Sequence, residues 1–199
     1  MNNVMNDAQH KPKALDANHI LDAALDLAQE QGNWYDLSLV ALADRCGTSV
    51  NEIYRHFADT NAIADAWFAQ ALESMLTPGI EGVDNLPVKT RLEYIIWRWF
   101  EALAPYQRVT AQMLKSKLHP PHIHHWVPMI FDLSRLVQLW RDLAGLHTSG
   151  RRRQIEEIVL TGIFLVTLSA WCRDKSSQQA NAHSRLLALL EKAEQSGQF

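Results

Sequence analysis

Residues 38–57 read SLVALADRCGTSVNEIYRHF, and this stretch decides how the chain is interpreted. Ser38 can cap a helix of about two turns, Gly47 suits a turn that needs positive φ, and Ser49 can cap a second helix. The apolar residues spaced to form a small core shared by these helices are Leu42, Ile53 and Phe57. This is a helix-turn-helix pattern, in which the second helix can lie in the DNA major groove. Plain helical hairpins share the same pattern.

The residues on either side of this stretch also have helical spacing. Upstream, we predict a helix that begins near Asp16 and ends at Gly32, a good C-terminal cap. Its continuous apolar face consists of Ile20, Ala23, Ala24, Leu27 and Ala28. Downstream, Asp59 or Thr60 caps a fourth helix that contains Trp67.

From about His19 to Trp67, the chain resembles TetR-type transcriptional regulators. The stretches that carry the resemblance are ILDAALDLAQEQG, the capping Ser38, ALADRCG and TSVNEIYRHF, whose ending Tyr54-x-His56-Phe57 is the most specific part. The resemblance implies a three-helix DNA-binding head, a fourth connecting helix, and a helical body that binds small ligands and dimerises. It covers about a quarter of the chain.

For such a regulator we expect a homodimer that binds a palindromic operator, with its two heads reaching successive major grooves. The residues expected to recognise the operator are Thr48, Ser49, Asn51, Arg55 and His56. Ser38 and Thr60 are expected at phosphates, and Tyr54 can contact either bases or phosphates. We expect a repressor that an apolar effector releases from DNA.

The charge distribution works against strong DNA binding. The chain has a net charge of −3, but residues 1–76 hold four Lys and Arg against eleven Asp and Glu, a charge of −7. The remaining residues therefore carry +4. Family members usually have a lysine where Thr60 stands and often a basic residue where Val50 stands. Because phosphate contacts supply most non-specific affinity for DNA, we predict a head with few such contacts.

Apolar residues recur at helical spacing along the rest of the chain, so we predict an all-α protein of about nine helices. The stretch 77–87, TPGIEGVDNLP, is a natural boundary because it contains two Pro and two Gly. It separates a head and connecting helix, 1–76, from a ligand-binding and dimerisation body, 77–199.

The body supports a different interpretation. It is similar in outline to the ubiquinone-biosynthesis lipid-binding accessory proteins, which share the TetR-like fold but have lost DNA binding. The matching stretches are VKTRLEYII, HPP, RDLAG and RRRQIEEIVLTGIFLVTLSAWCRD. This second resemblance implies an apolar tunnel for an isoprenoid or another lipid. A DNA-independent lipid-binding protein is therefore the alternative function.

Aromatic residues are concentrated in the body, where they can form either a filled helical core or an aromatic-lined cavity for a small apolar effector. The candidate ligand-binding residues are Trp97, Phe100, Met113, Trp126, Trp140, Phe164 and Trp171.

Dimerisation is expected through the last two long helices, Gln154–Arg173 and Ser184–Glu194, packed as a four-helix bundle with their symmetry mates. The stretch 158–171 is apolar nearly all round, and the second helix has a leucine stripe formed by Leu186, Leu189 and Leu190. One monomer would have difficulty covering both surfaces. The stretch 158–171, with 14 residues, is too short to cross a bilayer and is expected to be a buried helix.

Composition, cysteine content and motif content limit the classes of protein to which the chain can belong. Hydrophobic residues make up 47% and charged residues 21%, which excludes a largely disordered protein. Two cysteines, Cys46 and Cys172, cannot form a disulfide framework, and no secretory signal precedes the first helix, so we expect a soluble cytoplasmic protein. No catalytic motif occurs, and neither enzyme activity nor a cofactor is predicted.

Two charged or polar clusters have no assigned role. His119, His122, His124 and His125 lie beside a Pro-Pro break. They can be a solvated loop or helix start, or His122 and His125 can be a pair of metal ligands; no metal site is predicted. The run 151–153, three arginines, opens a helix and is expected to be a solvated turn, with an acidic partner or a membrane surface as the alternative.

Overall fold

The computed structural model describes residues 16–77, 85–117 and 123–199, with the side chains of 117 and 123–132 left undescribed. The described residues form helices and no strand, so the all-α prediction is confirmed. The α-helices are α1 (Ala17–Gln31), α2 (Leu39–Arg45), α3 (Val50–His56), α4 (Thr60–Leu76), α5 (Val88–Leu103), α6 (Gln107–Lys117), α7 (Ile123–Leu143), α8 (Gly150–Trp171) and α9 (Ala180–Gln195). The 3-10 turns are η1 (Trp34–Asp36), η3 (Ala104–Tyr106) and η5 (Ser177–Gln179).

The first four helices, which we call the head, begin at side-chain caps close in sequence. The capping bonds run from His19 N–H to Asp16 Oδ1 (2.7 Å), Ala41 N–H to Ser38 Oγ (3.1 Å), Glu52 N–H to Ser49 Oγ (3.2 Å) and Ala62 N–H to Asp59 Oδ1 (2.8 Å). Each bond satisfies an amide that the helix itself leaves unpaired. The predicted helix starts are therefore confirmed, and Asp59 rather than Thr60 caps α4.

The helix-turn-helix is held by the small core that the sequence predicts. Leu42 and Ile53 are completely buried, and Phe57 is nearly so. Gly47 has φ +63° at the turn, and no atom lies near the position of an added Cβ. Its requirement for glycine is therefore one of backbone conformation rather than of space.

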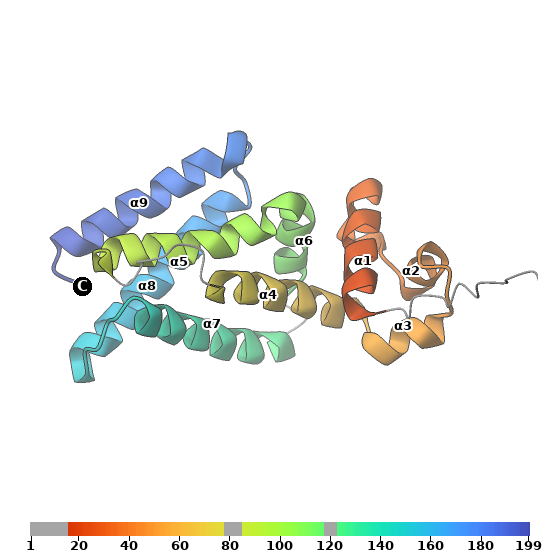
Figure 1. The fold of residues 1–199 in the computed structure, drawn as a ribbon, viewed down its shortest axis with the longest axis horizontal. Coiled ribbons are helices and arrows are strands. Elements are labelled where there is room, and N and C mark those ends of the chain that lie inside the picture. Colours follow the sequence, from red (N-terminus) through yellow and green to blue (C-terminus); the bar gives the residue numbers. More distant parts are fainter. Residues whose placement is uncertain (1–15, 78–84, 118–122) are drawn as a thin grey trace, which may run out of the picture.

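The remaining described helices, α5 to α9, form the body. Figure 1 shows α1, α2 and α3 at one end of the molecule, with α4 leading from them into the body. There α5 is the central helix, because it contacts α4, α7 and α9, while α8 packs on α7 and α9. The buried aromatic side chains of α5, α7 and α8 fill the space between these helices.

Hydrogen bonds between distant residues fix the head against the body. Gln112 of α6 accepts a bond from Trp34 N–H (2.7 Å) and donates one to the Gly32 carbonyl (3.2 Å). The Tyr106 hydroxyl donates to Asp26 Oδ1 at 2.6 Å. These bonds hold the middle of α6 and the turn before it on α1 and the residues around η1, so a movement of α6 would be transmitted to the head.

The last two helices differ from the sequence expectation in how much apolar surface they bury. Leu186 and Leu190 of α9 are completely buried in their own chain and Leu189 is half-buried, so the prediction of an uncovered leucine stripe is wrong. The stretch 158–171, expected to be a buried helix, is buried on one side only. One side of α8 packs on its neighbours, and the other presents the exposed residues Ile155, Ile158, Leu165 and Val166.

Among the described residues, α8 alone is long and apolar enough to cross a membrane by length and composition. The helix has 22 residues, whereas the apolar stretch 158–171, from which we expected no membrane span, has only 14. The same properties are typical of a core helix in a soluble bundle, and α8 carries the buried Glu156. By itself this helix is weak evidence for a membrane protein.

Candidate DNA-binding site

The second helix of the helix-turn-helix, α3, has two distinct faces. Ile53 faces the head core and is completely buried, with Phe57 following at the end of the helix. Val50 and Tyr54, one turn apart, are exposed, and Tyr54 has 60% of its surface accessible. The capped start at Ser49 and the buried face thus hold the opposite side of α3 outward, at the end of the molecule away from α8 and α9 (Figure 1).

The residues predicted to meet DNA lie on this outward face or at adjoining helix starts. Those that are exposed are Ser38, Ser49, Asn51, Tyr54, Arg55 and His56, whereas Thr48 and Thr60 are half-buried. Within the described part of the chain, the side chains of Asn51, Tyr54 and His56 have no hydrogen-bond partner. Their donors and acceptors are therefore available to base edges or phosphates.

The two capping serines have only part of their hydrogen-bonding capacity left. Ser38 Oγ and Ser49 Oγ each accept an amide bond at a helix start. A hydroxyl that accepts one bond can still donate its own hydrogen. Both serines can therefore donate to a phosphate oxygen without giving up the cap.

The arginines of the described head are already paired with carboxylates. Arg55 Nη1 lies 2.8 Å from Glu52 Oε2 on the same helix, and Arg45 Nη2 lies 2.6 Å from Glu30 Oε1 of α1. The hydrogen bonds that Arg45 donates to Glu30, together with the charge of that carboxylate, raise the pKa of Arg45. Because these pairs neutralise the cations locally, the head offers a phosphate less positive charge than its arginines suggest.

Cys46 lies beside the turn that precedes α3. Its side chain is half-buried, and burial raises the pKa of its thiol. A raised pKa keeps the sulfur protonated and poorly nucleophilic, which agrees with a packing role for this residue.

Six of the seven predicted ligand-binding residues lie together in the body core. Trp140 and Phe164 have ring centroids 4.9 Å apart, and Phe100 lies 5.7 Å from both Phe164 and Trp171. Trp97 and Met113 are also buried. The Trp126 side chain lies outside the described residues. These residues therefore form a packed aromatic core, and their contact with a ligand stays a prediction.

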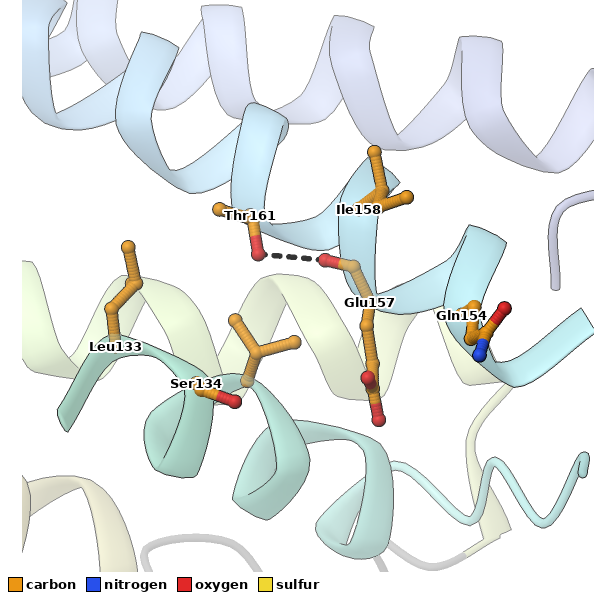
Figure 2. A pocket seen from close by; sticks show the side chains of 7 residues that line it. Leu133, Ser134, Gln154, Glu157, Ile158 and Thr161 are labelled. Carbon is orange, nitrogen blue, oxygen red and sulfur yellow. Dashed lines mark hydrogen bonds between the residues drawn. The ribbon is translucent and has the colours of Figure 1, made fainter. Parts of the chain in front are cut away.

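A surface hollow of about 470 Å³ lies elsewhere, between α7 and α8. Figure 2 shows Glu157 extending from α8 toward α7, with its backbone carbonyl accepting a bond from the Thr161 hydroxyl (2.7 Å). The lining is Leu133, Ser134, Val137, Gln154, Glu157, Ile158 and Thr161. This hollow has no signal in the sequence, because its two walls come from helices whose packing no local pattern reveals.

The two unassigned clusters have different outcomes. His119 and His122 lie outside the described residues, as do the side chains of His124 and His125. The arginine run lies in the first turn of α8, at the helix start where the sequence places it. Arg152 and Arg153 pair with Glu156 and Glu157, one turn further along α8. Their positive charge at a helix start is thereby offset by carboxylates.

Comparisons with known proteins agree with this geometry. The family model described as "Bacterial regulatory proteins, tetR family" matches residues 20–67, which include α2 and α3. A TetR transcriptional regulator from Rhodococcus sp. RHA1 has 17% sequence identity over 87% of this chain and 91% of that chain, with a TM-score of 0.61, and supports the fold alone. No curated protein matches the chain in sequence.

The TetR transcriptional regulator from Nitrosomonas europaea is more similar. It has 32% sequence identity and a TM-score of 0.80, over 89% of this chain and 97% of that chain. The similarity thus extends through the body as well as the head. The chain belongs to the TetR family of transcriptional regulators.

Proposed function

We propose that this protein is a ligand-responsive repressor that binds an operator as a homodimer in the cytoplasm. The observation that carries the proposal is the outward face of α3, where the polar groups of Asn51, Tyr54 and His56 have no partner among the described residues and Ile53 is the buried anchor. Such a helix can enter the major groove and contact base edges. This function requires neither a catalytic residue nor a cofactor.

Dimerisation is proposed through the exposed apolar side of α8. Its residues recur at intervals of three, seven and one, from Ile155 through Ile158 to Leu165 and Val166, and so follow one side of the helix. Ile158 has 71% of its surface accessible, which is unusual for a large apolar side chain in a bundle. A two-fold copy of the same helix would cover this stripe and place two heads on one duplex.

Release from DNA would occur when an effector favours a body conformation with the wrong spacing between heads. The contacts of Gln112 and Tyr106 with the head give such a change a route to α1. The effector can separate the aromatic core or occupy the hollow between α7 and α8, whose volume is within the range of small-molecule sites.

The test of the proposed function is retention of DNA. Purified protein is mixed at low salt with fragments of its own upstream region and with unrelated fragments of equal length. We expect preferential retention of an upstream fragment by a dimer. Failure to retain any upstream fragment would exclude the repressor function.

One observation favours the alternative, a lipid-binding protein that does not use DNA. Arg45 and Arg55 pair with glutamates within the head, which weakens the charge available for phosphates. Extraction of the purified protein into organic solvent distinguishes the two functions. A stoichiometric isoprenoid together with no DNA retention would establish the alternative, whereas DNA retention would support the repressor.

A further inference from the structure

The recognition helix begins with an apolar residue that its own fold covers only in part. Val50 is the first residue of α3 and remains 39% exposed. Ile53, one turn further along the helix, is completely buried in the head core, so Val50 lies at the edge between that core and the exposed surface of α3. Because Val50 lies on the outward face with Tyr54, its isopropyl group is free to meet whatever α3 approaches.

In a helix-turn-helix complex, residues at the N-terminal end of the recognition helix contact base edges. An isopropyl group neither donates nor accepts a hydrogen bond. A guanine O6, a purine N7 or a cytosine amino group placed against Val50 would lose water without gaining a partner. The apolar feature that bases offer in the major groove is the thymine 5-methyl group, and it alone complements this side chain.

We propose that Val50 is a specificity-determining residue that packs against a thymine methyl group in each operator half-site. The inference rests on the proposed operator binding and adds the chemistry of one base. The next residue agrees with it, because an asparagine amide such as that of Asn51 can form two hydrogen bonds with adenine. The start of α3 thus favours adjacent A·T pairs.

The experiment removes only the 5-methyl group of a thymine in the operator. Duplexes are selected from a random pool with the full-length wild-type protein at low salt, and each thymine of the recovered half-site is replaced in turn by uracil. Uracil keeps the base pair and lacks the methyl. One replacement should weaken wild-type binding by about fourfold per half-site, the effect of exposing one methyl-sized apolar group.

Variants assign that loss to one side chain. Val50→Ala should show a smaller difference than wild type between thymine- and uracil-containing duplexes at the sensitive position, and Val50→Ile should keep the wild-type preference for thymine. Val40→Ala is the matched control, because Val40 is an exposed valine on α2 with 59% of its surface accessible. This control should keep the wild-type sensitivity. Thermal unfolding of each variant confirms that it is folded.

The possible outcomes distinguish a failure of the Val50 assignment from a failure of the proposed operator binding. If selection recovers no duplex, the proposed operator binding fails, and the inference fails with it. If duplexes are recovered but uracil replacement affects wild type and Val50→Ala equally, operator binding stands and the assignment of Val50 is overturned. The same conclusion follows if the recovered half-site contains no thymine.

Discussion

The head and the body reach the same helical architecture by different means. In the head, α1 to α4 each begin at an acid or hydroxyl cap whose bond spans three residues. In the body, the residues before α5, α8 and α9 are Pro87, Ser149 and Gln179, and none of them makes a side-chain cap bond. Contacts between residues far apart in sequence hold the body instead, such as the stacking of Trp97 on His183 at 4.2 Å.

This difference determines which functional sites of the chain can be inferred from its sequence. Local bonds fix the shape of the head, so the outward face of α3 can be inferred from a short motif. Long-range packing fixes the body, so a ligand site there depends on how helices meet. We therefore expect substitutions to lower the free energy of unfolding most at buried long-range contacts in the body and at the helix caps in the head.

The largest effect is expected at a buried ion pair of the body. Arg141 and Glu156 are both about 2% exposed or less, and Arg141 Nη2 lies 3.0 Å from Glu156 Oε2. Arg141→Met would leave the carboxylate buried without this partner and should lower the free energy of unfolding by about 3–5 kcal/mol. Urea unfolding measures the loss.

The matched control for that change is Arg152→Met. Arg152 pairs with the same Glu156 but has a side chain 62% exposed, so its loss should change stability by less than about 0.5 kcal/mol. Equal losses in the two variants would contradict the account, because burial would then have no role in the strength of the pair.

The next effect concerns the exposed side of α8. Ile158→Glu would place two like charges in the proposed two-fold interface, and the dissociation constant of the dimer should rise about 100-fold or more. Sedimentation over a concentration series measures it, with Leu143→Glu, an exposed leucine at the end of α7, as the control. A wild-type protein that sediments as a monomer at micromolar concentration would refute the interface directly.

A smaller effect distinguishes the caps of the two regions. Ser49→Ala removes the acceptor for Glu52 N–H and should destabilise the protein by about 1 kcal/mol. Ser149→Ala, at the start of α8, should change little because Ser149 makes no side-chain cap bond. Denaturant unfolding of both variants tests the comparison, and a greater loss at Ser149 would reverse it.

The smallest effect depends on pH and lies where the head meets the body. The hydrogen bond to Asp26 raises the pKa of Tyr106 to about 12, above its ordinary value of 10. Since the folded-state pKa is the higher one, the bond contributes fully below pH 10 and its contribution is lost as the pH rises through 12. Tyr106→Phe should therefore be less stable than wild type below pH 10, by less than about 1 kcal/mol for this partly exposed pair.

Unfolding measurements at a series of pH values test this expectation. The difference between wild type and Tyr106→Phe should shrink between pH 10 and 12. Tyr54→Phe serves as the control, because Tyr54 is exposed and its hydroxyl has no partner within the described residues. A constant difference across that pH range would show that the Tyr106 hydroxyl does not contribute through this bond.

Most of the head could be predicted because its information is local. Asp16, Ser38 and Ser49 stand next to the helices they cap, and Leu42 and Ile53 recur at the spacing of a shared core. The body shows the limit of this reasoning. Helix positions follow from periodicity, but periodicity cannot say that Leu186 is covered by its own chain while Ile158 is left exposed. That depends on which helices become neighbours.

The candidate site follows the same division. The outward face of α3 was predictable, whereas the pairing of Arg55 with Glu52 was not, because a side chain can adopt several rotamers at that spacing. The hollow between α7 and α8 could not be predicted from the sequence, for a further reason. Gln154 and Ser134 belong to different helices, and neither has a distinctive sequence signal.

The central claim is that α3 binds DNA, and the salt dependence of duplex affinity tests it most directly. The affinity of the retained upstream fragment is measured over a range of salt for wild type, Arg55→Ala and Arg185→Ala. Arg55 lies on α3, and Arg185 is an exposed arginine of α9 in the body. Arg55→Ala should bind more weakly and lower the salt slope by about 1 for each head, while Arg185→Ala should match wild type. Equal slopes for wild type and Arg55→Ala, or the same loss in both variants, would contradict the account.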